Sequence, residues 1–192
     1  VACNQGCIER LSFEMKSVTC TFNPACGREY LGVPVPVAQS KRLWVIGAGP
    51  AGLSAALAAA GRGYKVEIFE KEASPGGQLR SASRPPYKEI YWDWAAWCIR
   101  QLEKRDVKIR CGEEWTAESL RERKPDAVIL AAGADPATPD IPGLASPHVR
   151  DARELLLEGA MAEGPTVILG GWYVGMETAD FLIARGVGVT LL

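Results

Sequence analysis

Short apolar runs alternate along the chain with glycine turns and longer amphipathic stretches. The run Leu43–Ile46 is too short for a helix and is typical of a buried parallel strand. Further strands are expected over 66–69, 107–109, 127–130, 166–169 and 187–192. Helices are expected between strands, over 53–60, 88–104 and 176–184. Strands that alternate with helices predict an α/β fold with a parallel sheet.

The helix expected over 88–104 is amphipathic, and we expect its apolar face to pack in a core or an interface. That face carries Ile90, Trp94, Trp97, Cys98 and Leu102. Cys98 lies on this helix and Cys111 at a strand end, and we interpret both as packed thiols rather than ligands.

A glycine motif, G-A-G-P-A-G at 47–52, joins the first strand to the first helix. Gly47 allows a tight turn, Gly49 lets a pyrophosphate reach the backbone, and Gly52 lets the helix press on the strand. Glu70 ends the next strand and can hold ribose hydroxyls. The motif therefore predicts a Rossmann-like adenine-dinucleotide site, with a turn that binds nothing as the alternative.

A second, altered motif of the same kind lies at 170–175, again between a strand and a helix. Trp172 stands at its middle glycine position. A side chain of this size could block the pyrophosphate, or the loop could be reshaped around it. The unit is either a nicotinamide-dinucleotide site or a structural repeat without a nucleotide.

Four of the six cysteines fall in the first 26 residues, at Cys3, Cys7, Cys20 and Cys26. Disulfides would need an oxidising compartment, which nothing else in the sequence suggests. Thiolates on iron are the preferred interpretation. A zinc knuckle and unrelated buried thiols remain as alternatives.

Composition excludes several classes of protein. With 192 residues, 47% hydrophobic, and a net charge of -1, the chain is neither disordered nor a nucleic-acid binder that works by bulk charge. The uncharged stretch 43–61 is broken by glycines, so we expect no membrane span. Residues 1–30 lack a signal-peptide pattern, and a cytoplasmic location is expected. His148, the only histidine, lies in a predicted loop, and we assign no catalytic side chain.

We expect four regions along the chain. They are a Cys-rich segment and linker at 1–40, an FAD- or ADP-binding part at 41–133, a proline-rich linker at 134–164, and a truncated second βαβ unit at 165–192. The chain starts with Val and ends inside a predicted strand, so we expect it to be a segment of a longer polypeptide.

Taken in order, the motifs resemble the C-terminal half of the iron–sulfur flavoproteins related to 2,4-dienoyl-CoA reductase, trimethylamine dehydrogenase and bacterial NADH:flavin oxidoreductases. Each motif alone is ordinary, but their order and spacing together are specific. The matching motifs are CNQGC at 3–7, NP at 23–24, GAGPAG at 47–52, Glu70, GGQL at 76–79, AAG at 131–133 and VGMETA at 174–179.

The resemblance implies a three-layer, glutathione-reductase-like nucleotide fold and a [4Fe–4S] cluster held by Cys3, Cys7 and Cys20. The fourth ligand would precede Val1, and Cys26 would be an extra thiol. The residues implied for FAD or ADP are Gly47, Ala48, Gly49, Pro50, Ala51, Gly52, Glu70, Lys71, Gly77, Gln78, Leu79, Ala132 and Gly133. Those implied for NAD(P)H are Gly170 and Gly175.

The function implied is electron transfer between NAD(P)H, FAD, the cluster and an FMN bound to a barrel outside this chain. The alternative is a non-catalytic ADP-binding module of a trimethylamine-dehydrogenase-like enzyme. In either case we expect this segment alone to be inactive and its partners to be adenine dinucleotides. The resemblance leaves open whether the parent protein is a homo-oligomer.

Overall fold

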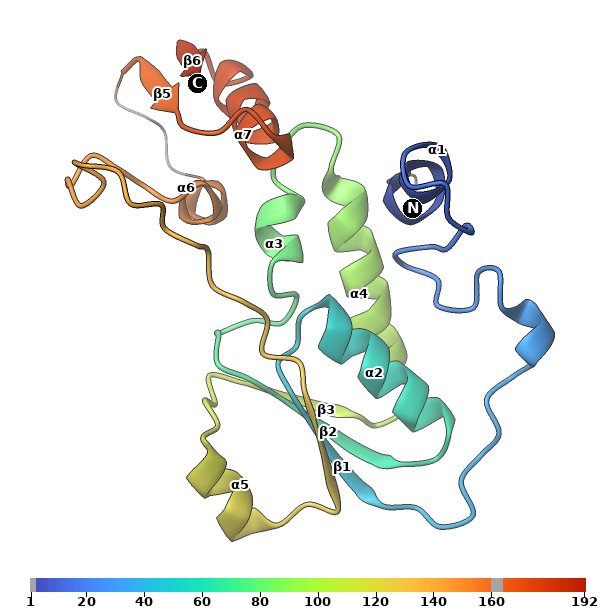
Figure 1. Ribbon diagram of the computed structural model, residues 1–192. Coiled ribbons are helices and arrows are strands. Elements are labelled where there is room, and N and C mark those ends of the chain that lie inside the picture. Colours follow the sequence, from blue (N-terminus) through green and yellow to red (C-terminus); the bar gives the residue numbers. More distant parts are fainter. Residues whose placement is uncertain (1–2, 160–163) are drawn as a thin grey trace.

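The computed structural model describes residues 3–159 and 164–192. Its centre is a four-stranded parallel sheet in the order β3-β2-β1-β4 (Figure 1). In register, Val45 lies beside Ile68 on one side and Ile129 on the other. The predicted α/β fold with a parallel sheet is confirmed. The strands are β1 (Arg42–Ile46), β2 (Lys65–Glu70), β3 (Lys108–Cys111) and β4 (Ala127–Leu130).

Two helices, α2 (Pro50–Gly61) and α4 (Glu89–Glu103), cover one face of the sheet and pack on each other (Figure 1). The short helix α3 (Leu79–Ala82) precedes α4. Apolar side chains from the sheet and both helices form the main core between these layers. Its buried members are Leu43, Val45, Ala48, Leu53, Ala56, Ala59, Val66, Ile68, Ala95, Cys98, Leu102 and Val107.

Helix α4 buries a stripe that differs from the predicted face. The buried residues are Tyr91, Ala95, Cys98 and Leu102, whereas Trp97 is 48% exposed. Successive helical residues lie about 100° apart, so Trp97 stands beside this stripe rather than on it. Trp97 therefore does not pack in this core, and its packing in an interface stays a prediction, whereas Cys98 is the buried thiol that was predicted.

Aromatic side chains occupy the opposite face of the sheet. Trp44, Phe69 and Trp115 lie against one another, with ring centroids 4.7 to 5.0 Å apart. Arg123 of helix α5 (Ala117–Arg123) covers the Trp115 ring at 5.3 Å. Figure 1 shows α5 on the side of the sheet away from α2 and α4. This cluster fixes Trp115 at the carboxyl edge of the sheet.

A smaller second unit follows. Its two strands pair in parallel, as predicted, and Leu156, Phe181 and Leu182 form its buried core. The elements are α6 (Ala152–Glu158), β5 (Thr166–Ile168), α7 (Tyr173–Ile183) and β6 (Val189–Leu191).

Helix α6 lies inside the stretch predicted as the linker 134–164, of which residues 160–163 fall outside the described residues. Its N-cap is Asp151, whose carboxylate accepts a hydrogen bond from the Arg153 backbone N–H at 2.8 Å. Asp151 followed by Glu154 and three leucines is the helix-start pattern that identifies such an element. The prolines of this region favoured the prediction of a linker, so the helix-start pattern was not used.

The N-terminal segment contains three short helical turns (Figure 1). Within residues 3–159 and 164–192, no helix combines the length and the apolar character that crossing a bilayer requires. The turns are η1 (Gln5–Glu9), α1 (Arg10–Ser12) and η2 (Glu29–Leu31).

Candidate functional site

The first glycine turn, at 47–52, depends on Gly47, a position that accepts no other residue. Gly47 follows β1 with φ of +103°, and a Cβ there would overlap the carbonyl of Ala131. Its N–H donates to the carbonyl of Phe69 at 2.7 Å, which joins the turn to the end of β2. Gly47 therefore brings the ends of three strands together at one edge of the sheet.

Helix α2 starts immediately after this turn, with Gly49 as N-cap and Pro50 at its first position. A Cβ on Gly52 would overlap the Gly47 carbonyl oxygen, so the absence of a side chain lets the helix press on the turn. A Cβ on Gly77 would lie only 2.8 Å from Gly49 Cα. The first glycine turn and the loop that carries Gly77 thus pack backbone against backbone at the start of α2.

Glu70, at the end of β2, is buried and forms two hydrogen bonds to backbone groups. Oε2 accepts from the N–H of Ala48 at 2.7 Å, and Oε1 accepts from the N–H of Glu72 at 3.0 Å. Its carboxylate therefore anchors the glycine turn, a role that the sequence did not predict. A carboxylate has about four acceptor positions, so acceptor capacity remains for ribose hydroxyls.

A cleft of about 780 Å³ opens at this edge of the sheet. The predicted residues that line it are Gly47, Gly49, Pro50, Ala51, Glu70, Lys71, Gly77, Gln78, Ala132 and Gly133. Ala48, Gly52 and Leu79 lie behind its surface, because Ala48 and Gly52 are buried and Leu79 packs against the core.

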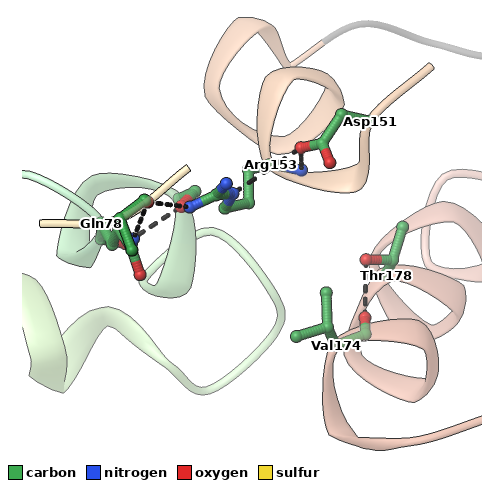
Figure 2. Close-up of polar contacts among 7 residues, drawn as sticks. Gln78, Asp151, Arg153, Val174 and Thr178 are labelled. Atoms are coloured by element: carbon green, nitrogen blue, oxygen red, sulfur yellow. Dashed lines mark hydrogen bonds and ion pairs between the residues drawn. The ribbon is translucent and has the colours of Figure 1, made fainter. Parts of the chain in front are cut away.

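The cleft also has walls that sequence reasoning missed. Trp115, two glutamates that precede it and residues of α6 also line the cleft. Gln78 and Arg153 both donate to the carbonyl of Ala134, at 3.1 and 3.4 Å, as Figure 2 shows. These bonds hold α3, the segment after β4 and α6 together across the cleft. The missed residues are Ile46, Phe69, Glu72, Arg80, Ser81, Glu113, Glu114, Trp115, Ala131, Ala134, Asp135, Pro136, Asp151, Arg153, Glu154 and Leu157.

The second glycine turn repeats the geometry of the first despite Trp172. Gly170 has φ of +110°, and its N–H donates to the carbonyl of Leu192 at 2.7 Å. A Cβ on Gly175 would overlap the Gly170 carbonyl oxygen. Gly170 and Gly175 therefore form a turn with the backbone geometry of the first, and neither residue lines the cleft beside the first turn.

Side chains tie the second unit to the first. Lys88, just before α4, pairs with Glu177 of α7 at 2.7 Å. Burial acts to lower the pKa of Lys88, but the hydrogen bond and charge of Glu177 outweigh it, so the pKa is raised. Thr178 beside it donates to the carbonyl of Val174 at 2.7 Å, within α7 (Figure 2). Lys88 therefore stays charged at neutral pH and holds α7 against α4.

The N-terminal cysteines lie on two segments that touch. The Thr19 N–H donates to the Gly6 carbonyl at 2.9 Å, and a Cβ on Gly6 would lie 2.8 Å from Thr21 N. Gly6 thus lets the turn that carries Cys7 pack against the segment that carries Cys20. Among the described residues, no three Cys, His, Asp or Glu side chains gather closely enough to hold a single metal ion.

Phe22 attaches this segment to α4. Its ring centroid lies 5.6 Å from that of Tyr91 and 5.1 Å from that of Trp94. The indole N–H of Trp94 also donates to the Phe22 carbonyl at 3.2 Å. The cysteine segment is therefore positioned against α4 by contacts that involve no metal.

We expect Phe22→Ala to release the cysteine segment while the sheet stays folded. Loss of two aromatic contacts should lower the local opening free energy of residues 3–28 by about 1–3 kcal/mol. Hydrogen exchange of the backbone amides measures this opening. Phe13→Ala is the matched control, since Phe13 is 81% exposed in the same segment. Equal exchange in both variants would contradict the anchoring role.

The two remaining cysteines are not placed for ligation or attack. Burial raises the pKa of Cys98 to about 11, so this thiol is neutral at physiological pH. Burial and then the charge of Glu70 raise the pKa of Cys111. The His148 ring lies within 3.2 Å of the Ser146 hydroxyl on an exposed loop. None of these groups lines the cleft.

Glu70→Ala should weaken adenine-dinucleotide binding by about 1–3 kcal/mol, because a charged acceptor and the anchor of the turn are lost together. Titration of the cofactor-free protein with FAD measures the dissociation constant. Glu67→Ala removes a carboxylate from the outer face of the same strand and should leave the constant unchanged. Undiminished affinity in a folded Glu70→Ala variant would refute the role of this residue.

A model of the family "pyridine nucleotide-disulphide oxidoreductase" matches residues 41–192, both glycine turns included. The chain belongs to this family. The pyridine nucleotide-disulphide oxidoreductase domain is an NAD(P)H-dependent flavoprotein domain, and adenine dinucleotides are its cofactors. The cleft beside the first turn lies within the residues that this family model matches.

Curated relatives extend over the cysteine segment as well. The chain is 37% identical to a bilirubin reductase of Mediterraneibacter gnavus over 190 residues, covering 99% of this chain and 30% of that protein. It is 38% identical to an NADH oxidase of Thermoanaerobacter brockii over 201 residues, covering 100% and 30%. The chain thus spans about 30% of the length of these relatives.

Solved structures agree with this assignment. A complex of 2-naphthoyl-CoA reductase matches with a TM-score of 0.91 and 31% identity, over 99% of this chain and 29% of that one. The 6-hydroxypseudooxynicotine amine oxidase of Pseudomonas geniculata N1 matches with a TM-score of 0.79 and 30% identity, over 97% and 30%. The predicted Rossmann-like nucleotide fold is confirmed, and the resemblance is confirmed at the level of this flavoprotein class.

Proposed function

We propose that the chain is the dinucleotide-binding part of an iron–sulfur flavoprotein oxidoreductase of the dienoyl-CoA-reductase and NADH:flavin-oxidoreductase kind. Electrons would pass between NAD(P)H, FAD, a [4Fe–4S] cluster and FMN in a barrel outside residues 1–192. The observation that carries the proposal is the pair of matching glycine turns, the first of which opens into the cleft of about 780 Å³.

FAD would be held at the first turn. Gly49 and the N-terminus of α2 offer backbone N–H groups and a helix dipole to the pyrophosphate, and Gly47 supplies the tight turn that leads into the helix. Glu70 offers acceptors to ribose hydroxyls, and Lys71 lies beside it on the cleft wall. Bound FAD would supply the capacity to accept a hydride from NAD(P)H and to release electrons singly. The chain itself supplies position and electrostatics, so no side chain is assigned as an acid or base.

The second turn would hold the nicotinamide dinucleotide. Gly170 and Gly175 keep the backbone form that admits a pyrophosphate at a helix start. The Lys88–Glu177 pair, which joins α4 and α7, would keep the second unit beside the first. This arrangement suits transfer between two dinucleotides bound on neighbouring units.

The cluster would be ligated by Cys3, Cys7, Cys20 and a fourth residue outside the described residues. The contact of Gly6 with the Cys20–Thr21 backbone supports this donor set, because it draws two of the ligand segments together. A cubane cluster has its irons spread apart, so its thiolates stand farther apart than those of a single ion. Cys26 is assigned no role as a ligand.

A non-catalytic ADP-binding module is the second candidate, and Trp172 favours it. This indole stands at the middle glycine position of the second turn, where a dinucleotide would contact the backbone. In that case ADP at the first turn would be a structural element beside an electron-transfer cluster. Under either candidate the 192-residue chain alone is expected to be inactive.

Analysis of the purified protein decides between these functions. We expect released FAD, flavin absorption bleached by NADH or NADPH, and stoichiometric iron and sulfide when the cluster is complete. Recovery of ADP without flavin would replace the first candidate by the second. Absence of any bound nucleotide after incubation with FAD and ADP would overturn both.

A further inference from the structure

The second glycine turn carries Trp172 where the first carries Gly49. Trp172 caps the start of α7 and is 77% exposed. Its ring centroid lies 5.3 Å from that of Tyr173. The indole therefore rests on the beginning of the helix with open space around it.

Backbone geometry decides the direction of this side chain. Trp172 has φ of -90° and ψ of -173°, and Gly49 has φ of -74° and ψ of -174°. The first glycines of these turns, Gly170 and Gly47, have φ of +110° and +103°. The N–H of each donates a hydrogen bond of 2.7 Å to a carbonyl at the end of the neighbouring strand. Because the backbone fixes the Cβ position, Trp172 leaves its turn as a side chain at Gly49 would leave the first turn.

In the first turn that direction leads into the cleft. The nearest atom to a Cβ at Gly49 would be Gly77 Cα, at 3.9 Å. Both Gly49 and Gly77 line the cleft. A side chain at this position would therefore enter the space through which a pyrophosphate approaches the helix start. By the same geometry, the Trp172 indole enters the corresponding space of the second turn.

We propose that Trp172 sets the affinity of the second turn for nicotinamide dinucleotides, because its indole covers the pyrophosphate position and turns aside before NAD(P)H binds. The proposal rests on the proposed function of the second unit. The exposure of Trp172 leaves room for this rotation. When only a fraction of molecules is open, the apparent affinity falls by that fraction.

Removal of the indole tests the proposal. In the FAD-loaded protein, Trp172→Gly should lower the dissociation constant for NAD⁺ about tenfold, as for an open fraction of roughly a tenth. Titration calorimetry measures the constant. Glycine is well accepted at an N-cap, so the fold is retained. Trp172→Phe should give an intermediate constant, and Trp97→Ala, on the exposed side of α4, should give none of this change.

Each other outcome counts against the proposal. An equal or larger dissociation constant in folded, FAD-loaded Trp172→Gly overturns it, since the indole would then be neutral or would support the ligand. In that case wild-type binding of NAD⁺ leaves the proposed function intact. Binding of NAD⁺ to neither protein, with FAD retained, overturns both the inference and the function assigned to the second turn.

Discussion

Gly52→Val is expected to unfold the nucleotide-binding unit or to lower its free energy of unfolding by about 3 kcal/mol or more. A Cβ on Gly52 would overlap the Gly47 carbonyl oxygen and lie 3.3 Å from the Val45 side chain. Gly47 cannot retreat, because its backbone is held between Ala131 and the carbonyl of Phe69. Urea unfolding followed by circular dichroism measures the loss.

Gly61→Ala is the control in the same helix. Gly61 lies in the last turn of α2, and nothing lies within 4 Å of a Cβ there. Alanine should therefore leave stability unchanged or raise it by about 0.5–1 kcal/mol through helix propensity. Similar unfolding curves for Gly52→Val and the wild type would show that the contact of α2 with the turn is not required.

Gly49→Trp should abolish FAD binding while the chain stays folded. The Gly49 backbone conformation is open to any residue, and a Cβ there makes only an ordinary contact with Gly77. The rest of the indole must then enter the cleft that both glycines line. We expect the dissociation constant for FAD to rise at least about 100-fold, equivalent to roughly 2.8 kcal/mol of lost binding energy.

Ala58→Trp adds the same indole to an exposed position of α2, outside the cleft lining. This variant should bind FAD like the wild type, which separates occlusion of the cleft from a general effect of tryptophan on the helix. Titration of cofactor-free protein with FAD, followed by flavin fluorescence, measures the dissociation constants of the wild type and the two variants. Normal affinity in folded Gly49→Trp would remove the first turn from the FAD site.

The strands and both glycine turns could be predicted because their signals are local. A buried run such as Leu43–Ile46 and a glycine with obligatory positive φ such as Gly47 constrain the backbone from neighbours in sequence. Helix starts were less certain. Helix α2 begins at Pro50, three residues before the predicted start, because glycine and proline at its beginning hide the apolar periodicity.

The clustering of cysteines near the N-terminus could be read from the sequence, but the position of this segment in the fold could not. The resemblance to iron–sulfur flavoproteins implied Cys3, Cys7 and Cys20 as cluster ligands, and this role stays a prediction. Their attachment to α4 depends on Phe22 meeting Tyr91 and Trp94, about 70 residues away in the chain. No pattern within either segment encodes that contact.

By itself, the sequence determined the alternation of strands and helices, the two glycine turns at 47–52 and 170–175 and the acid that follows the first. Only the tertiary structure decided that Glu70 anchors Ala48 from 22 residues away, and that Gln78 meets Ala134 from 56 residues away. The physical reason is the sequence separation between the residues that interact. Backbone conformation follows from adjacent residues, whereas the walls of the cleft exist only after the sheet has brought distant segments to one edge.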